Sequence, residues 1–90
     1  LDLVAVSGST LVFVEVRTRR SRQRGLAEES VTPTKQRRLI TLAEAFLQQL
    51  DDEGTPWPGS WRIDVVAIQA QPGNVTARLR HVQHAVEAIE

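Results

Sequence analysis

Two apolar runs open the chain, and a turn sequence separates them. Residues 1–6 and 10–16 are rich in valine and leucine, and Gly8 and Ser9 lie near the middle of the gap between them. β-branched runs separated in this way indicate a β-hairpin. Glycine at the first central position suits a two-residue type II′ turn, which fixes the register of the two strands.

A helical pattern follows a polar stretch. Residues 19–30 are polar and arginine-rich without periodicity, which predicts a mobile loop. Thr32 is typical of an N-cap, and Pro33 suits the first helical position. The apolar residues beyond them recur at helical spacing: Leu39, Ile40, Leu42, Ala43, Phe46, Leu47 and Leu50. This pattern predicts an amphipathic helix that ends near Asp51.

The second half of the chain returns to strand patterns. Residues 61–68 form an apolar run too continuous for an edge strand, so we expect a third strand that is buried on both faces. A strand, a helix and a strand in this order imply parallel pairing with a right-handed crossover. Residues 75–80 favour a fourth strand, and residues 83–89 favour a short closing helix.

Composition limits the class of protein. Ninety residues predict a single domain over residues 1–90, and the order of elements makes it α/β. The absence of cysteine excludes disulfides and thiolate metal sites. No apolar segment reaches membrane-spanning length and no secretory signal pattern is present, so we expect a cytoplasmic protein with no membrane contact. The formal net charge is zero, yet basic residues crowd one third of the chain: Arg17, Arg19, Arg20, Arg22, Arg24, Lys35, Arg37 and Arg38.

Two carboxylates converge in the predicted hairpin. Side chains alternate across a strand, so Glu15 and Arg17 share one face. The predicted register sets Asp2 opposite Glu15, with Cβ atoms about 4.5–5.5 Å apart. Facing carboxylates need a compensating cation, and a hard divalent ion such as Mg²⁺ meets that need.

A simpler interpretation is a solvated hairpin face on which Arg17 pairs with Asp2 or Glu15. The position of these charges favours a site instead, because they lie in the most hydrophobic part of the chain and precede a helix expected to cover one face of the sheet.

These residues also carry a resemblance. Asp2, the hairpin turn and the Glu15-Val16-Arg17 triplet resemble the D…ExK signature of PD-(D/E)XK nucleases. Four segments together resemble the YraN family, which is related to Holliday-junction resolvases: residues 1–5, 11–19, 31–36 and 62–68. The resemblance implies a restriction-endonuclease-like core, namely a mixed sheet with an antiparallel hairpin, a crossover helix and a parallel strand. It also implies DNA as partner and Mg²⁺ or Mn²⁺ bound by Asp2 and Glu15.

Two departures from the family pattern stand out. The lysine of the ExK motif is Arg17 here, and a guanidinium can neutralise a phosphate but cannot readily act as a base. The family's N-terminal helix and first strand are also absent from this sequence, so the resemblance implies a truncated core.

Further candidates follow from the resemblance and from position. Related nucleases bring a glutamine or lysine from this helix toward the site, which adds Gln36 as a catalytic candidate and Lys35 as a DNA contact. The predicted DNA contacts in the loop are Arg19, Arg20, Arg22 and Arg24, because phosphate neutralisation dominates affinity for nucleic acids.

Other polar and aromatic residues favour structural roles. Asp64, near the start of the third strand, is expected to pair with Arg17 or Arg62 rather than to bind metal. A lone histidine such as His81 is more often structural than catalytic. Trp57 and Trp61 lie beside prolines or near them and favour the edge of a core over base stacking.

Three functions compete at this point. The leading hypothesis is a Mg²⁺-dependent DNA endonuclease, with some selectivity for branched DNA. The alternatives are a nucleic-acid-binding module without turnover and a structural domain that forms a homodimer through an unpaired edge strand.

Overall fold

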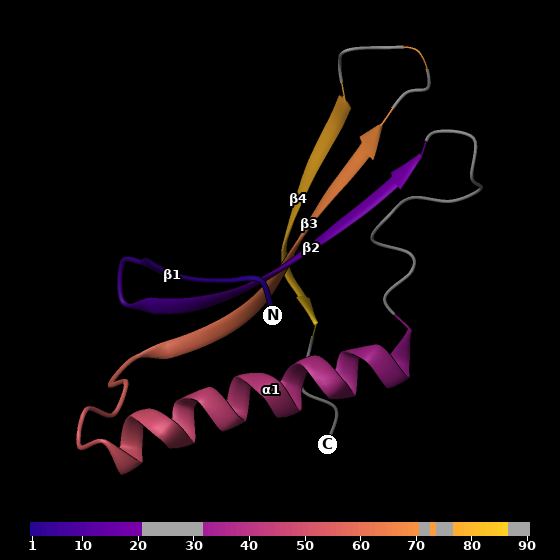
Figure 1. The fold of residues 1–90 in the computed structure, drawn as a ribbon. Coiled ribbons are helices and arrows are strands. Elements are labelled where there is room, and N and C mark those ends of the chain that lie inside the picture. Colours follow the sequence, from indigo (N-terminus) through magenta and orange to yellow (C-terminus); the bar gives the residue numbers. More distant parts are fainter. Residues whose placement is uncertain (21–31, 71–72, 74–76, 87–90) are drawn as a thin grey trace.

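The computed structural model describes residues 1–20, 32–70, 73 and 77–86. Its elements are β1 (Leu3–Ser7), β2 (Thr10–Arg20), α1 (Pro33–Asp52), β3 (Ser60–Ala70) and β4 (Ala77–Val86). The strands form one four-stranded mixed sheet in the order β1-β2-β3-β4, and α1 runs along one face of it (Figure 1). The α/β core predicted from the sequence is confirmed, and α1 is not apolar enough to cross a bilayer.

The hairpin has the predicted register. β1 and β2 pair antiparallel, with Ser7 opposite Thr10. Gly8 has a φ of 61° whereas Ser9 is not in the positive-φ region, a combination that fits a type II′ turn and excludes type I′. The turn therefore fixes which side chains of β2 share a face with each side chain of β1.

α1 begins and ends close to the predicted residues. The Thr32 hydroxyl accepts a hydrogen bond from the Lys35 amide at 3.3 Å, and Pro33 follows it. The helix ends at Asp52, one residue beyond the predicted end. β3 then pairs parallel with β2 along the full length of both strands, which confirms the strand-helix-strand crossover.

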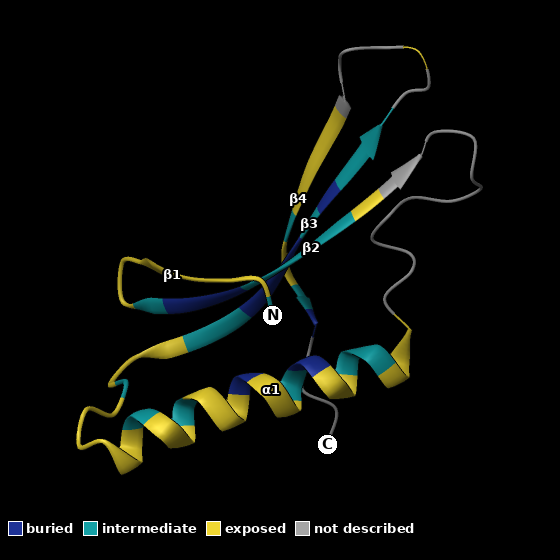
Figure 2. Ribbon diagram, in the orientation of Figure 1, coloured by how far each residue is buried: buried dark blue, intermediate teal, exposed yellow. Residues whose placement is uncertain are grey.

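The core lies between α1 and the sheet (Figure 2). Phe13 is fully buried, and the rings of Phe46 and Trp61 meet it edge-on at centroid distances of 5.5 and 5.8 Å. Trp57 packs at the edge of the same cluster and donates its indole N–H to the Ser60 carbonyl at 2.8 Å. Both tryptophans therefore have the structural role that their positions favoured.

The end of the described chain corrects one prediction. The predicted closing helix over residues 83–89 is wrong for its first four residues, because 83–86 continue β4, and residues 87–90 lie outside the described part. Pairing of β4 with β3 outweighs the weak local helical pattern. The predicted fourth strand is confirmed from Ala77 onward, and it extends to Val86.

The loop predicted over residues 19–30 is wrong for its first two residues. Arg19 and Arg20 belong to β2, where they pair with Gln69 and Ala70 of β3, so the strand continues into the segment expected to be a loop. Residues 21–31 lie outside the described part. The ends of β2 and β3 and the start of β4 extend away from α1 (Figure 1).

Replacing the N-cap tests how α1 is held. Thr32→Ala removes the side-chain acceptor of the Lys35 amide, so we expect the free energy of unfolding to fall by about 1 kcal/mol in urea denaturation. Thr32→Ser keeps the hydroxyl and should recover most of that loss. Equal stability of the alanine and serine variants would show that the cap contributes nothing.

Candidate functional site

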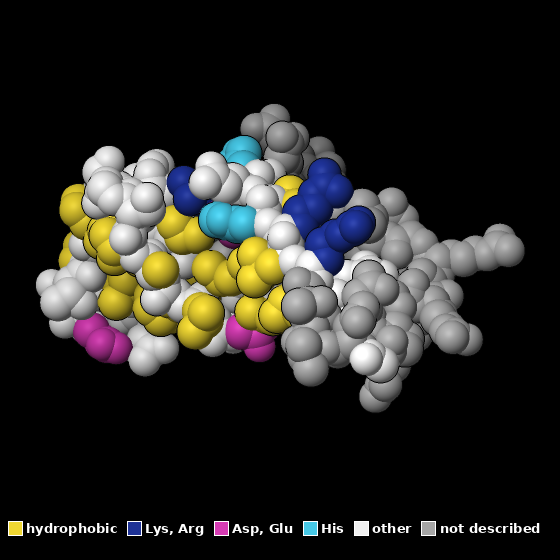
Figure 3. Space-filling model, turned by 90° about the horizontal axis from the view of Figure 1, so that it is seen from above, with side chains coloured by type: hydrophobic (Ala, Val, Ile, Leu, Met, Phe, Trp, Pro, Cys, Tyr) yellow, Lys and Arg dark blue, Asp and Glu magenta, His cyan; other side chains and the backbone are white. Residues whose placement is uncertain are grey.

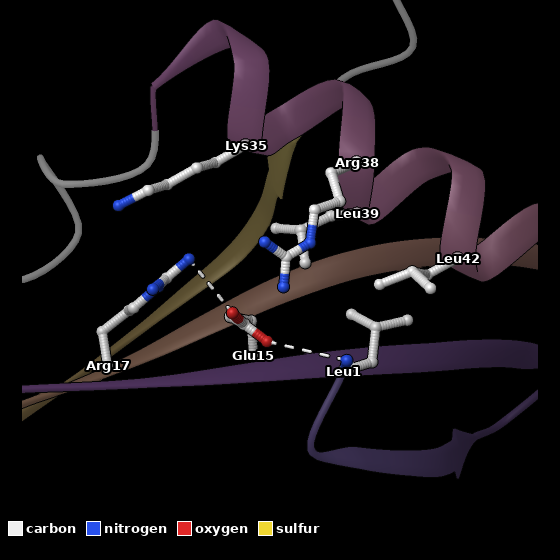
Figure 4. Close-up of a pocket in the computed structure, with 7 residues that line it drawn as sticks. All are labelled: Leu1, Glu15, Arg17, Lys35, Arg38, Leu39 and Leu42. Carbon is white, nitrogen blue, oxygen red and sulfur yellow. Dashed lines mark ion pairs between the residues drawn. The ribbon is translucent and has the colours of Figure 1, made fainter.

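A pocket of about 90 Å³ lies between β2 and the N-terminal half of α1 (Figure 4). Glu15 and Arg17 reach it because odd-numbered positions of β2, such as the buried Leu11 and Phe13, face the helix. Its other lining residues are Leu1, Lys35, Arg38, Leu39 and Leu42. Of these, the four residues from α1 recur at i, i+3, i+4 and i+7, so they lie on one face of the helix.

An ion pair occupies the floor of the pocket. Arg17 Nη2 lies 3.1 Å from Glu15 Oε2, and the Glu15 side chain is only 14% exposed. The amino group of Leu1 lies 3.9 Å from the other carboxylate oxygen. The Arg17 Nε is buried and has no hydrogen-bond partner among the described residues. The pairing of Arg17 with Glu15 is one that the simpler interpretation anticipated, but it lies beneath α1 rather than on an open face.

Two more cations line the pocket from α1. Lys35 and Arg38 are three residues apart, which puts them on neighbouring turns of one helical face. In Figure 4 the Arg38 guanidinium lies between the helix and Glu15. Sequence reasoning did not select Arg38, although its spacing from Lys35 is the pattern that would have suggested it.

Asp2 lies beside the pocket and is not among its lining residues. Its amide donates to the Val14 carbonyl at 3.0 Å, and its Oδ2 accepts from the Val16 amide at 2.8 Å. The hairpin therefore brings Asp2 level with Glu15, but the Asp2 carboxylate caps the edge of β2 while Glu15 enters the pocket. A metal ion shared by Asp2 and Glu15 stays a prediction.

The remaining candidates are distributed unevenly. Gln36 is half-buried on α1 beside Lys35, and it is not among the described residues that line the pocket. Arg19 and Arg20 extend β2 beyond Arg17, which places their backbone on the side of the pocket away from the hairpin. Arg22 and Arg24 lie outside the described residues.

A second charged cluster centres on Asp64, which is fully buried. Its Oδ1 accepts from Arg62 Nε at 3.0 Å and from the His84 amide at 2.9 Å, and its Oδ2 lies 2.8 Å from His81 Nε2. The predicted pairing with Arg62 is confirmed, and His81 has a structural partner. Burial acts to raise the pKa of this carboxyl, but the hydrogen bonds from the His84 amide, Arg62 and His81 outweigh burial and lower the pKa below its ordinary value.

The backbone of β4 is bent to reach this carboxylate. The pairing of β3 with β4 shifts register between Ile63 and Val65, and His84 has a φ of 55°. That conformation is uncommon for a residue other than glycine and costs on the order of 1 kcal/mol or more. The irregularity directs the His84 amide at Asp64, so the buried charge gains a donor that a regular ladder would not supply.

Comparison with known proteins gives the family of this chain. The family described as Uncharacterised protein family UPF0102 matches residues 1–68. This chain belongs to that family. A UPF0102 protein of Roseiflexus castenholzii is 48% identical over 88 residues, which cover 97% of this chain and 68% of the relative. A UPF0102 protein of Herpetosiphon aurantiacus is 47% identical over 83 residues, which cover 92% of this chain and 65% of the relative.

The chain therefore spans about two thirds of the length of the UPF0102 relatives that it matches. A UPF0102 protein of Pseudomonas aeruginosa, 46% identical over 88 residues, shows the same proportion at 68%. The resemblance of the four segments to the YraN family, which is the UPF0102 family, is confirmed.

Neutralising Asp64 tests its role in this UPF0102 member. Because the folded pKa is lowered, the stability from the ionised carboxyl is present above the ordinary value of 3.8 and is lost as the pH falls below it. We expect Asp64→Asn to lower the free energy of unfolding by about 2 kcal/mol at pH 7, because donors from Arg62 or His81 lose a charged acceptor. The difference from wild type should narrow on acidification, as measured by urea denaturation across pH.

His84→Asn is the matched control. His84 contributes its backbone amide, and asparagine tolerates the same φ, so stability should stay within about 0.5 kcal/mol of wild type. A gap between wild type and Asp64→Asn that stays constant down to acid pH would contradict the ionised role of Asp64.

Proposed function

We propose that this chain forms the core of a metal-dependent DNA endonuclease that hydrolyses phosphodiester bonds. The observation that carries the proposal is the Glu15–Arg17 pair in a pocket that also holds Lys35 and Arg38. In a site of this composition the carboxylate would bind the metal ion, and the cationic side chains would contact the phosphate. The D…ExK-like order of Asp2, Glu15 and Arg17 supports the same function.

The donor set fits a hydrated Mg²⁺ or Mn²⁺ ion. Among the described residues no three carboxylate, histidine or cysteine side chains gather in a way that could enclose a metal. Mg²⁺ does not need such a cage, since it is commonly held by one or two carboxylates together with waters and substrate phosphate. Asp2 and Glu15 would hold the ion, Asp2 through Oδ1, since its Oδ2 accepts from the Val16 amide. When bound, the ion would polarise the phosphate and lower the pKa of its water.

Arg17 has the role of stabilising charge that develops on the phosphate. Its guanidinium stays protonated, so it is a donor and not a base. In the described structure one of its nitrogens holds Glu15, while the buried Nε has no partner. Arg17 therefore keeps Glu15 inside the pocket and also carries a positive charge toward the substrate.

The basic residues around the pocket supply the DNA-binding surface. Lys35 lines the pocket, and Gln36 is the neighbouring polar residue on α1. Arg19, Arg20, Arg22 and Arg24 follow Arg17 in sequence. Arginine and lysine contacts to phosphate carry no base information, so we propose recognition of backbone or branched shape rather than of sequence.

A binding module without turnover is the second candidate, and the same ion pair favours it. Glu15 is already neutralised by Arg17, so the carboxylate has a partner without any metal. A protein of this kind would bind DNA in a salt-dependent manner and leave it intact.

Metal-linked stability separates these two functions. Mg²⁺ at ten times its Kd should stabilise the folded protein by about 1.4 kcal/mol, because on this proposal only the folded chain offers both the Asp2 and the Glu15 carboxylates to one ion. Glu15→Gln should abolish this gain and any nicking of plasmid or branched DNA. Glu44→Gln, an exposed position of α1 outside the pocket, is the matched control and should keep both.

Arg17→Lys restores the residue of the ExK motif and should raise cleavage if the arginine limits it. Should Mg²⁺ leave the melting temperature unchanged and Glu15→Gln alter nothing, the endonuclease proposal fails, and DNA binding without cleavage would leave the binding module.

The arginine cluster after Arg17 generates a separate prediction. Replacing Arg19, Arg20, Arg22 and Arg24 with glutamine should weaken DNA binding and make it less dependent on salt, because each lost phosphate contact lowers the slope of log K against log salt by about one. Affinity is measured by fluorescence anisotropy at several salt concentrations. Unchanged affinity and slope would show that these four arginines do not contact DNA and are ordinary solvated residues.

A further inference from the structure

The pocket contains more positive charge than its carboxylate can balance. Three cationic side chains and one carboxylate line it, and the Leu1 amino group lies 3.9 Å from that carboxylate, so positive charges exceed negative ones by at least two among the described residues. Arg17 already uses Glu15, which leaves Lys35 and Arg38 without a counter-charge in the lining. Cations gathered in this way around a partly enclosed space attract an anion, and an anion with two charges balances them best.

The pocket is also divided into a charged part and an apolar part. Figure 4 shows Leu1 and Leu42 at one end, Lys35 and Arg17 at the other, and Arg38 between them. A volume of about 90 Å³ has room for one phosphate-sized group. The Leu1 and Leu42 side chains offer no partner to a second phosphate of the same nucleic acid, and the Leu1 amino group beside them faces Glu15.

We propose that this pocket is a subsite for the terminal phosphate of a nucleic acid strand. A phosphate monoester carries about −1.5 to −2 charge near pH 7, whereas a phosphate within the chain carries a single negative charge. The monoester therefore matches the excess of two positive charges.

Arg38 is the residue that gives the subsite its selectivity. Its planar guanidinium presents paired donors that suit two oxygens of one phosphate, whereas Lys35 acts as a point charge. The buried Arg17 Nε is a further donor that the described protein leaves unpaired. The proposal rests on the proposed function for its ligand class, a nucleic acid, and not on metal binding or cleavage.

Binding to strands that differ at one end tests the subsite. The probes are a single oligonucleotide with hydroxyl ends, with a 5′-phosphate or with a 3′-phosphate, measured by fluorescence anisotropy in EDTA so that no cleavage occurs. We expect one phosphorylated form to bind on the order of tenfold more tightly than the hydroxyl form, the gain of one charge-assisted contact. The two phosphorylated probes identify which end of a strand is taken.

Arg38→Gln should remove this preference, and Arg38→Lys should retain part of it. Arg37→Gln is the matched control, because Arg37 is the exposed neighbour whose guanidinium contacts Thr34 and not the pocket, and it should keep the full preference. Circular dichroism melting of each variant establishes that the fold is intact.

Equal affinity for all three probes overturns the subsite, as does a full preference in Arg38→Gln. If wild type binds all three equally, DNA binding stands and only the subsite fails. If it binds none of them, the subsite and the proposed action on DNA fail together. A clear end preference without Mg²⁺-linked stabilisation would support the subsite and count against the endonuclease.

Discussion

The parallel pairing of β2 with β3 is the constraint on which the rest of the structure depends. Parallel neighbours need a crossover, and α1 supplies it by lying across the face that holds Phe13. The odd positions of β2 from Leu11 to Arg17 then face the helix. Once the apolar positions are used in the core, Glu15 and Arg17 are the next two on that face, so the pocket is charged because the crossover covers a strand longer than the core.

Each face of the sheet contains a carboxylate that pairs with an arginine of its own strand. Glu15 pairs with an arginine two residues later on β2, and Asp64 pairs with an arginine two residues earlier on β3. Their neighbours in the register show that they lie on opposite faces, and Figure 3 shows the histidines beside hydrophobic side chains on the face away from α1. The difference lies in the remaining partners, because Asp64 is satisfied by the protein whereas the Glu15 cluster retains unbalanced cations.

Local patterns predicted most of this fold. Gly8 and Thr32 act within a few residues of themselves, so the turn and the helix start were accessible from sequence. The path of residues 83–86 was not, because the left-handed backbone of His84 depends on a carboxylate twenty residues away in sequence. Arg38 was accessible from sequence but not selected, since it follows Lys35 by three residues on one face of α1. The hydrogen bond that Asp2 accepts from the Val16 amide depends on the side-chain conformation of Asp2, which a strand pattern does not specify.

The part of the sheet that extends away from α1 is expected to open locally more easily than the part that α1 covers. Thr18 and Leu79 are exposed in this part of the sheet, and Leu79 retains 65% of its surface. Backbone hydrogen bonds there have little apolar burial behind them, so local opening costs less than unfolding the core. Amide protons of β2 should therefore exchange with solvent progressively faster from Phe13 toward Arg20. We expect the change from slow to fast exchange near the pocket, so Arg17 would lie between a firmly held and a more easily opened part of the same strand.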